Sequence, residues 1–125
     1  MQEKLNKAWE LKKKGHYIEA LDLYQQVHDY LVDEAREYAQ SLPGTRIDEG
    51  NTLKIMPLFF TEAQNYLRKD KLFCTILNNM GVIYAELGKD DSAERCFEDA
   101  ISFIPEGVDY PDPKINYQNL KNPNL

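Results

Sequence analysis

The sequence has few of the residues on which catalytic and metal-binding sites depend. Its 125 residues include two cysteines and two histidines. Cys74 and Cys96 make neither a disulfide framework nor a cysteine metal cluster. We interpret both as small buried hydrophobic residues of a protein in a reducing compartment.

Other chemical groups are equally sparse. His16 falls in a predicted turn between two helices, and His28 lies on an apolar helical stripe, where we expect a semi-buried side chain. No further histidine completes a metal site, and the sequence has no glycine-rich phosphate loop. Neighbouring carboxylates such as Asp33 and Glu34 point apart on a helix, so we interpret them as solvated. These absences predict a protein that is not an enzyme and needs no metal or cofactor.

Long apolar runs and an excess of basic residues are also lacking. No stretch approaches the ~20 apolar residues of a membrane span, and the start, MQEKLNKAWELKKK, has no signal-peptide core. Lysine and arginine total 15 against 21 aspartate and glutamate residues, a net charge of −6. This acidic balance disfavours nucleic acid and anionic membrane as partners. We therefore expect a cytoplasmic protein, in which Lys12, Lys13 and Lys14 form a solvated helix end.

What the sequence does contain is one pattern of small and large apolar residues that occurs twice. The pattern is typical of a helix, a short turn with glycine, and a second helix that packs closely against the first. The length of the whole chain suits one compact domain. Equivalent pairs, all 73 residues apart, are Ala8 and Gly81, Leu11 and Tyr84, Gly15 and Gly88, Ala20 and Ala93, Tyr24 and Phe97, and Val27 and Ala100.

Residues 77–105, LNNMGVIYAELGKDDSAERCFEDAISFIP, closely resemble a tetratricopeptide repeat (TPR). Residues 8–27 match that pattern less fully, because Lys4 and Lys7 stand at apolar positions. A first repeat lacks a neighbour on one side, so polar residues are reasonable there. The resemblance implies an all-α, right-handed solenoid of antiparallel helix-turn-helix units. It rests on Leu77, Met80, Gly81, Tyr84, Ala93, Phe97, Ala100 and Pro105.

The middle of the chain departs from the repeat pattern. Apolar residues over 17–42 follow one stripe, which predicts a single helix that ends before Pro43. A second stripe over 53–67 predicts another helix, with Pro57 in its first turn or at a kink. We expect the chain to bend over residues 68–71 before the next repeat begins.

The C-terminal part carries its own helix signals. Asp91 followed by Glu94 resembles a capping box, which predicts the start of a helix there. Beyond Pro105 the sequence reads as a linker. Asp112 then opens a short predicted helix that reaches about Lys121 and covers the open end of the array.

Together these observations predict one all-α domain over residues 1–125, a TPR-like array of about two and a half to three repeats. The predicted parts are a first repeat at 1–34, an irregular long-helix middle repeat at 35–73, a second clear repeat at 74–107, and a C-terminal linker with a capping helix at 108–125.

The resemblance also implies a binding surface. In TPR arrays the first helix of each repeat lines a concave groove that receives an extended peptide or a partner helix. Asparagine amides both donate and accept hydrogen bonds, and a tryptophan offers an aromatic anchor. Packing of Leu5 and Trp9 beneath the middle helices is the alternative. The implied groove residues are Gln2, Leu5, Trp9, Lys12 and Lys13 from the first repeat, and Thr75, Asn78, Asn79, Val82 and Glu86 from the last.

The expected function is therefore non-enzymatic binding of a protein or peptide partner on the concave face. TPR domains that clamp the C-terminal carboxylate of heat-shock chaperones need lysine and asparagine where Leu5 and Trp9 stand, and only Asn79 fits, so no such clamp is expected. One alternative is a self-associating homodimeric scaffold. Another is an adaptor like the microtubule-interacting-and-trafficking (MIT) domains. Residues 19–35 resemble the second helix of those domains, but this resemblance leaves residues 77–105 unexplained.

Overall fold

The computed structural model describes residues 1–42 and 61–123, which contain helices and no strand. The predicted all-α helix-turn-helix array is confirmed. The predictions for Pro43, Pro57 and the first part of the 53–67 stripe lie outside the described residues. Residues 61–67 are helical. The other helices are α1 (Gln2–Lys13), α2 (Tyr17–Ser41), α4 (Leu72–Glu86), α5 (Asp90–Ser102) and α6 (Asp112–Lys121).

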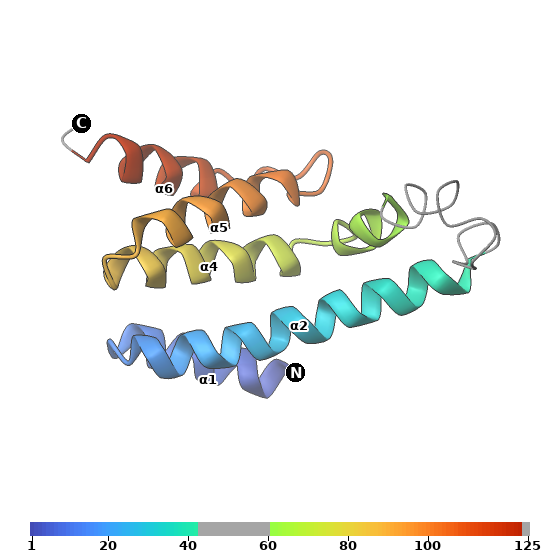
Figure 1. Cartoon of the computed structure of the whole chain (residues 1–125), viewed down its shortest axis with the longest axis horizontal. Helices are drawn as coiled ribbons and strands as arrows, with labels where there is room; N and C mark the ends of the chain where they lie inside the picture. Colours follow the sequence, from blue (N-terminus) through green and yellow to red (C-terminus); the bar gives the residue numbers. More distant parts are fainter. Residues whose placement is uncertain (43–60, 124–125) are drawn as a thin grey trace.

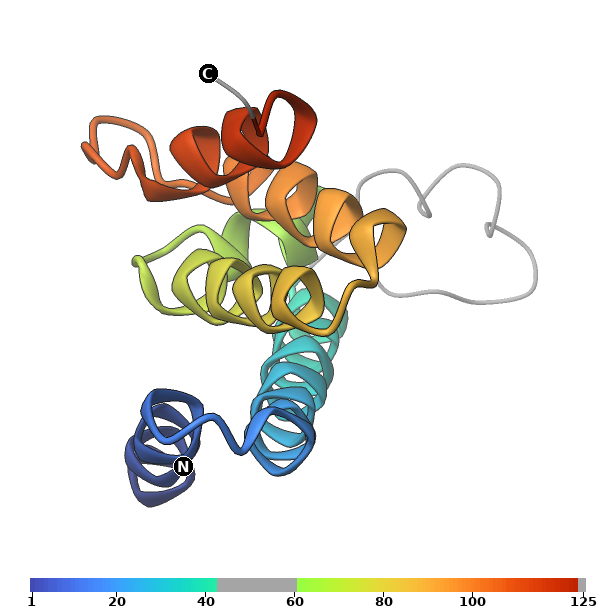
Figure 2. The same cartoon turned by 90° about the vertical axis from the view of Figure 1, so that its left-hand side faces the viewer.

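The helices form two antiparallel pairs with one more helix on top (Figure 1). Helices α1 and α2 make the first pair and α4 and α5 the second; α4 packs on α2, and α6 packs on α5 and α4. Seen end-on in Figure 2, α1 and α4 lie on one side of the stack, with α2 beside α1 and beneath α4. The face that α1 and α4 share, here called the α1–α4 face, corresponds to the predicted groove side.

The turns of the two pairs repeat each other bond for bond. Gly15 and Gly88 both have positive φ, 81° and 74°, which glycine adopts without the steric penalty of other residues. The residue after each glycine donates its N–H to the carbonyl five residues back: His16 to Leu11 at 2.8 Å, and Lys89 to Tyr84 at 2.9 Å. This agreement supports the 73-residue equivalence seen in the sequence.

The core of each pair is built from the predicted small and large residues. Ala8, Ala20, Ala93 and Ala100 are fully buried. In the second pair, α4 and α5 pack tightly at Gly81, since a Cβ added there would lie 2.5 Å from Cε1 of Phe97. Glycine at this position is therefore required by the neighbouring aromatic ring.

Helix α2 is a single helix of 25 residues, as the stripe over residues 17–42 predicts. It extends well beyond the 12-residue α1. Its far half packs against residues 61–67, where the rings of Tyr38 and Tyr66 are 4.8 Å apart. The long helix thus supports both the first pair and the segment that leads into α4.

The predicted bend over residues 68–71 is confirmed, because these residues are not helical. Asp70 accepts a hydrogen bond from the N–H of Leu72 at 3.0 Å, and Nε of Arg68 donates to the carbonyl of Ser102 at 2.8 Å. These bonds fix the bend at the start of α4 and tie it to the end of α5.

Two further expectations concern the C-terminal part. The predicted helix from Asp112 to about Lys121 is confirmed as α6. The predicted capping box is wrong: α5 begins at Asp90 with Lys89 as N-cap, and no side chain caps it. Asp91 thus lies inside the first turn, where its charge favours the helix N-terminus but its carboxylate caps nothing.

The division into repeats stays a prediction. Its boundary between residues 34 and 35 falls inside α2, and the middle unit, 35–73, includes residues outside the described ranges. The described elements alone give two helix pairs and the added α6.

Candidate binding surface

One predicted groove residue of α1 reaches across to α4. Nζ of Lys12 donates to Oδ1 of Asn79 at 3.1 Å. Partial burial lowers the pKa of the Lys12 ammonium from its ordinary value. This bond links the two helices that form the face.

The aromatic side chain of α1, that of Trp9, is exposed to solvent. Trp9 is 48% exposed, and Nζ of Lys13 lies 4.0 Å from the centre of the Trp9 ring. Leu5 instead packs against the hydrophobic core. The side chain of Gln2 is exposed. The alternative of packing beneath other helices therefore holds for Leu5 and not for Trp9.

Asn78 does not face a ligand, because the C-terminal segment covers it. The residue is 5% exposed. Its Nδ2 donates to Oη of Tyr110 at 3.3 Å, and its Oδ1 accepts from Nδ2 of Asn116 at 3.0 Å. Lys71 lies above the Tyr110 ring, with Nζ 4.8 Å from the ring centre. Asn78 thus joins α6 to α4 and is committed to the fold.

Replacing Asn78 with alanine should destabilise the protein by about 1 kcal/mol, because two polar partners lose their bonds at a partly buried site. Asn79→Ala is the matched change one position along α4, and should cost less than about 0.5 kcal/mol because Lys12 can turn to water. Urea unfolding followed by circular dichroism measures both. Equal losses would contradict the structural role assigned to Asn78.

The remaining predicted residues of α4 are divided between two neighbourhoods. Thr75 is half-buried and forms a hydrogen bond with Tyr110. Burial raises the pKa of the Tyr110 hydroxyl, and the hydrogen bond with Thr75 offsets part of that increase. Val82 and Glu86 line a hollow of about 250 Å³ against α5 and α6, together with Ala85, Phe97, Asn116, Asn119 and Leu120. The structure therefore places these residues toward α6 and does not join them with Trp9 in one patch.

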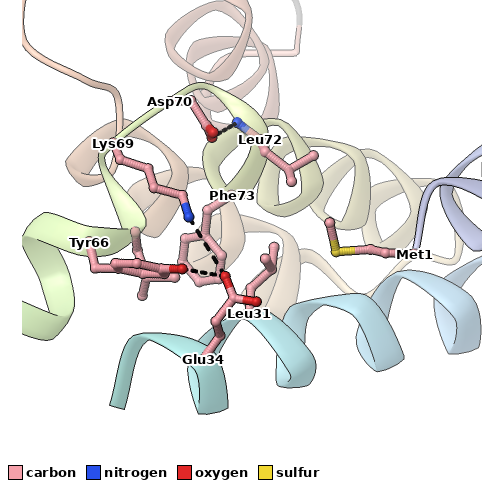
Figure 3. Close-up of a pocket in the computed structure, with 9 residues that line it drawn as sticks. Met1, Leu31, Glu34, Tyr66, Lys69, Asp70, Leu72 and Phe73 are labelled. Carbon is pink, nitrogen blue, oxygen red and sulfur yellow. Dashed lines mark hydrogen bonds and ion pairs between the residues drawn. The ribbon is translucent and has the colours of Figure 1, made fainter. Parts of the chain in front are cut away.

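A second hollow lies between the beginnings of α1 and α4, over the middle of α2 (Figure 3). Its volume is about 160 Å³. We call it the Glu34 hollow, after the carboxylate on its rim. Its lining residues are Met1, Leu31, Glu34, Tyr66, Leu67, Lys69, Asp70, Leu72 and Phe73.

The rim of the Glu34 hollow is a polar network. The hydroxyl of Tyr66 donates to Oε1 of Glu34, and Nζ of Lys69 lies 3.6 Å from the same oxygen (Figure 3). The hydrogen bond from Tyr66, and then the Lys69 charge, lower the pKa of Glu34, so its carboxylate is ionised at neutral pH. The interpretation of Glu34 as a solvated side chain holds only in part, because the side chain is 35% exposed and its carboxylate accepts a hydrogen bond from Tyr66.

Sequence reasoning missed this hollow because its residues come from elements that the repeat pattern does not describe. Tyr66, Lys69 and Asp70 belong to the segment that leads into α4, and Leu31 and Glu34 to the extended part of α2. A usable signal was present: Glu34 follows Leu31 by three residues and so borders the apolar stripe of the long helix.

The other groups weighed in the sequence are integrated in the fold. The ring of His28 stacks on Phe73 at 5.2 Å between ring centres, and Nδ1 lies 3.0 Å from Oδ1 of Asp29. Cys74 is buried, and burial raises the pKa of the Cys96 thiol to about 11. In residues 1–42 and 61–123 no cluster of histidine, cysteine or acidic side chains is arranged to hold a metal ion. None of the described helices combines the length and apolar composition needed to cross a membrane.

The geometry defines a class of protein: an all-α array of stacked helix-turn-helix units whose first helices share one face. Residues 73–104 match the tetratricopeptide repeat family, so the pair formed by α4 and α5 is assigned as a TPR repeat. No curated protein and no solved structure matches the chain. The matched residues cover α4, its turn and α5, the pair in which the sequence pattern is most complete. TPR repeats form a non-enzymatic family that generally mediates protein–protein interaction.

Proposed function

We propose that this chain is a non-enzymatic interaction module that binds a peptide or a partner helix along the α1–α4 face. The observation that carries the proposal is Trp9, which is 48% exposed on the first helix of the first unit. Nearby apolar residues of α1, Leu5 and Leu11, are packed against the core. The indole thus stands out as apolar surface that the fold itself does not use.

An exposed indole on a rigid helix suits a binding role. Tryptophan and arginine dominate the energies of protein interfaces, and a large ring gains much contact area for little loss of conformational freedom. The Lys12–Asn79 bond holds α1 against α4 before any partner arrives. A surface ordered in advance leaves most of the ordering cost to the partner segment.

The test is a selection of random twelve-residue peptides displayed on phage against the folded protein. Peptides enriched on the wild type should bind Trp9→Ala at least tenfold more weakly, the size expected for loss of an aromatic anchor. Ile18→Ala is the control, because Ile18 is 65% exposed on α2 and lies outside the proposed face. Fluorescence anisotropy of labelled peptides gives the affinities, and circular dichroism establishes that each variant is folded.

Two outcomes contradict the proposal. One is a selection that enriches no peptide, together with sedimentation showing a homodimer, which would favour the self-associating scaffold. The other is a set of peptides that bind wild type and Trp9→Ala equally, which would place the binding surface elsewhere on the array.

A further inference from the structure

We propose that the Glu34 hollow receives one large apolar side chain of the partner, with a lysine or arginine of the partner beside it on the rim. This inference rests on the proposed function, since residues at the beginnings of both α1 and α4, Met1 and Leu72, line the hollow. It adds the chemistry of the partner segment.

The size and walls of the hollow select an apolar side chain. Its volume of about 160 Å³ is close to that of an apolar cavity that holds one benzene molecule, roughly 150 Å³. A site for a whole small-molecule ligand is typically larger, ~300 Å³ or more. Its apolar lining residues include Leu31, Leu67, Leu72 and Phe73. One leucine or phenylalanine side chain therefore fits this space.

The charges on the rim favour a cation beside that side chain. The charged side chains that line the hollow are the carboxylates of Glu34 and Asp70 and the ammonium of Lys69. The ion pair of Lys69 with Glu34 has its atoms 3.6 Å apart, and its two side chains are 48% and 35% exposed. Such a pair contributes little and exchanges readily. A guanidinium or ammonium of the partner can approach the same carboxylate with better geometry.

A neighbouring hollow gives the partner segment a direction. Met1 lines both the Glu34 hollow and a second one of about 250 Å³, whose other lining residues are Lys4, Gln26, Val27 and Tyr30. Val27 and Leu31 are one helical turn apart on α2, so the two hollows follow this helix. Tyr30 is 57% exposed at the second hollow. A partner segment that continues from the Glu34 hollow past the first turn of α1 would therefore meet this tyrosine ring.

The experiment repeats the random twelve-residue peptide selection on wild type, Glu34→Gln and Asp33→Asn in parallel. Asp33 is the matched control: it is the preceding residue of α2, its side chain is 72% exposed, and it does not line the hollow. The wild-type pool should be enriched in phenylalanine or leucine next to lysine or arginine. Labelled peptides from that pool should bind Glu34→Gln about tenfold more weakly and Asp33→Asn as well as wild type.

A second readout guards against a folding defect in Glu34→Gln. Amide chemical shifts of the ¹⁵N-labelled wild type, titrated with one selected peptide, should move at Leu31, Leu67 and Phe73. Higher salt should weaken the same peptide, because the rim contact is electrostatic and partly exposed.

The outcomes separate this inference from the proposed function. Peptides that depend on Trp9 but show no basic residue and no effect of Glu34→Gln overturn the inference and leave the proposed function standing. A selection without any Trp9-dependent peptide overturns both. A concentration-dependent dimer that Glu34→Gln weakens would assign the hollow to a second copy of the chain, and this too overturns the inference.

Discussion

Phe97→Ala is expected to lower the free energy of unfolding by about 3–5 kcal/mol, the range for truncating a buried aromatic side chain. Phe97 is 2% exposed, and its ring fills the space over Gly81 between α4 and α5. That pair forms the most extensive interface between described helices. The deleted ring leaves a cavity between two helices joined by a short turn, so the site can collapse only in part.

Urea unfolding monitored by circular dichroism measures this loss. Ile115→Ala on α6 is the control, because Ile115 is 50% exposed and should change stability by no more than about 0.5 kcal/mol. A loss at Phe97 no larger than at Ile115 would contradict the packing of α5 on α4.

Gly81→Ala should also destabilise the protein, by about 2 kcal/mol, although alanine is the better helix former by about 1 kcal/mol. The reason is steric: the new methyl group would lie 2.5 Å from Cε1 and 2.7 Å from Cδ1 of Phe97. The clash exceeds the gain in propensity because the ring is buried between α4 and α5, and moving it would disturb the packing of these two helices.

A double-mutant cycle tests that cause. If the ring is responsible, Gly81→Ala should cost much less in a Phe97→Leu background, and the two changes should not be additive. Thermal or urea unfolding of the four proteins gives the coupling energy. Additive losses, or a stabilised Gly81→Ala protein, would show that the ring does not lie over Gly81.

Regular local patterns made most of the fold predictable. The pairing of small residues with large ones, Ala20 with Tyr24 and Ala93 with Phe97, predicts a close approach of two helices. This pattern is local, so it can be recognised without knowledge of distant contacts. Glycines at positions 15 and 88 mark turns because their positive φ is costly for other residues. The stripe over residues 17–42 is long enough to define α2 without tertiary information.

The candidate binding surface was predictable only in part, because exposure depends on contacts between distant residues. Asn78 has the spacing of a groove residue, yet Tyr110 and Asn116, more than thirty positions away, bond to its amide. No local sequence pattern around Asn78 predicts that α6 packs over this position. Trp9 shows the opposite case, since it keeps the spacing of a groove residue and remains 48% exposed.

Glu34 illustrates a third limit. An acidic residue on a helix next to other acids is usually solvated, and its neighbours in sequence support that interpretation. Its partners Tyr66 and Lys69 come from the segment before α4, which packs against α2 more than thirty residues away in the sequence. Long-range pairing of this kind cannot be derived from helical periodicity.

The most direct test of the central claim is to map a selected peptide onto the protein by amide chemical shifts. If the partner binds the α1–α4 face, the largest shifts cluster on α1 around Trp9, on the facing residues of α4, and at the Glu34 hollow, while the outer surfaces of α5 and α6 stay unchanged. Shifts concentrated on α5 or α6, with Trp9 unaffected, would contradict the claim that the α1–α4 face is where this array binds its partner.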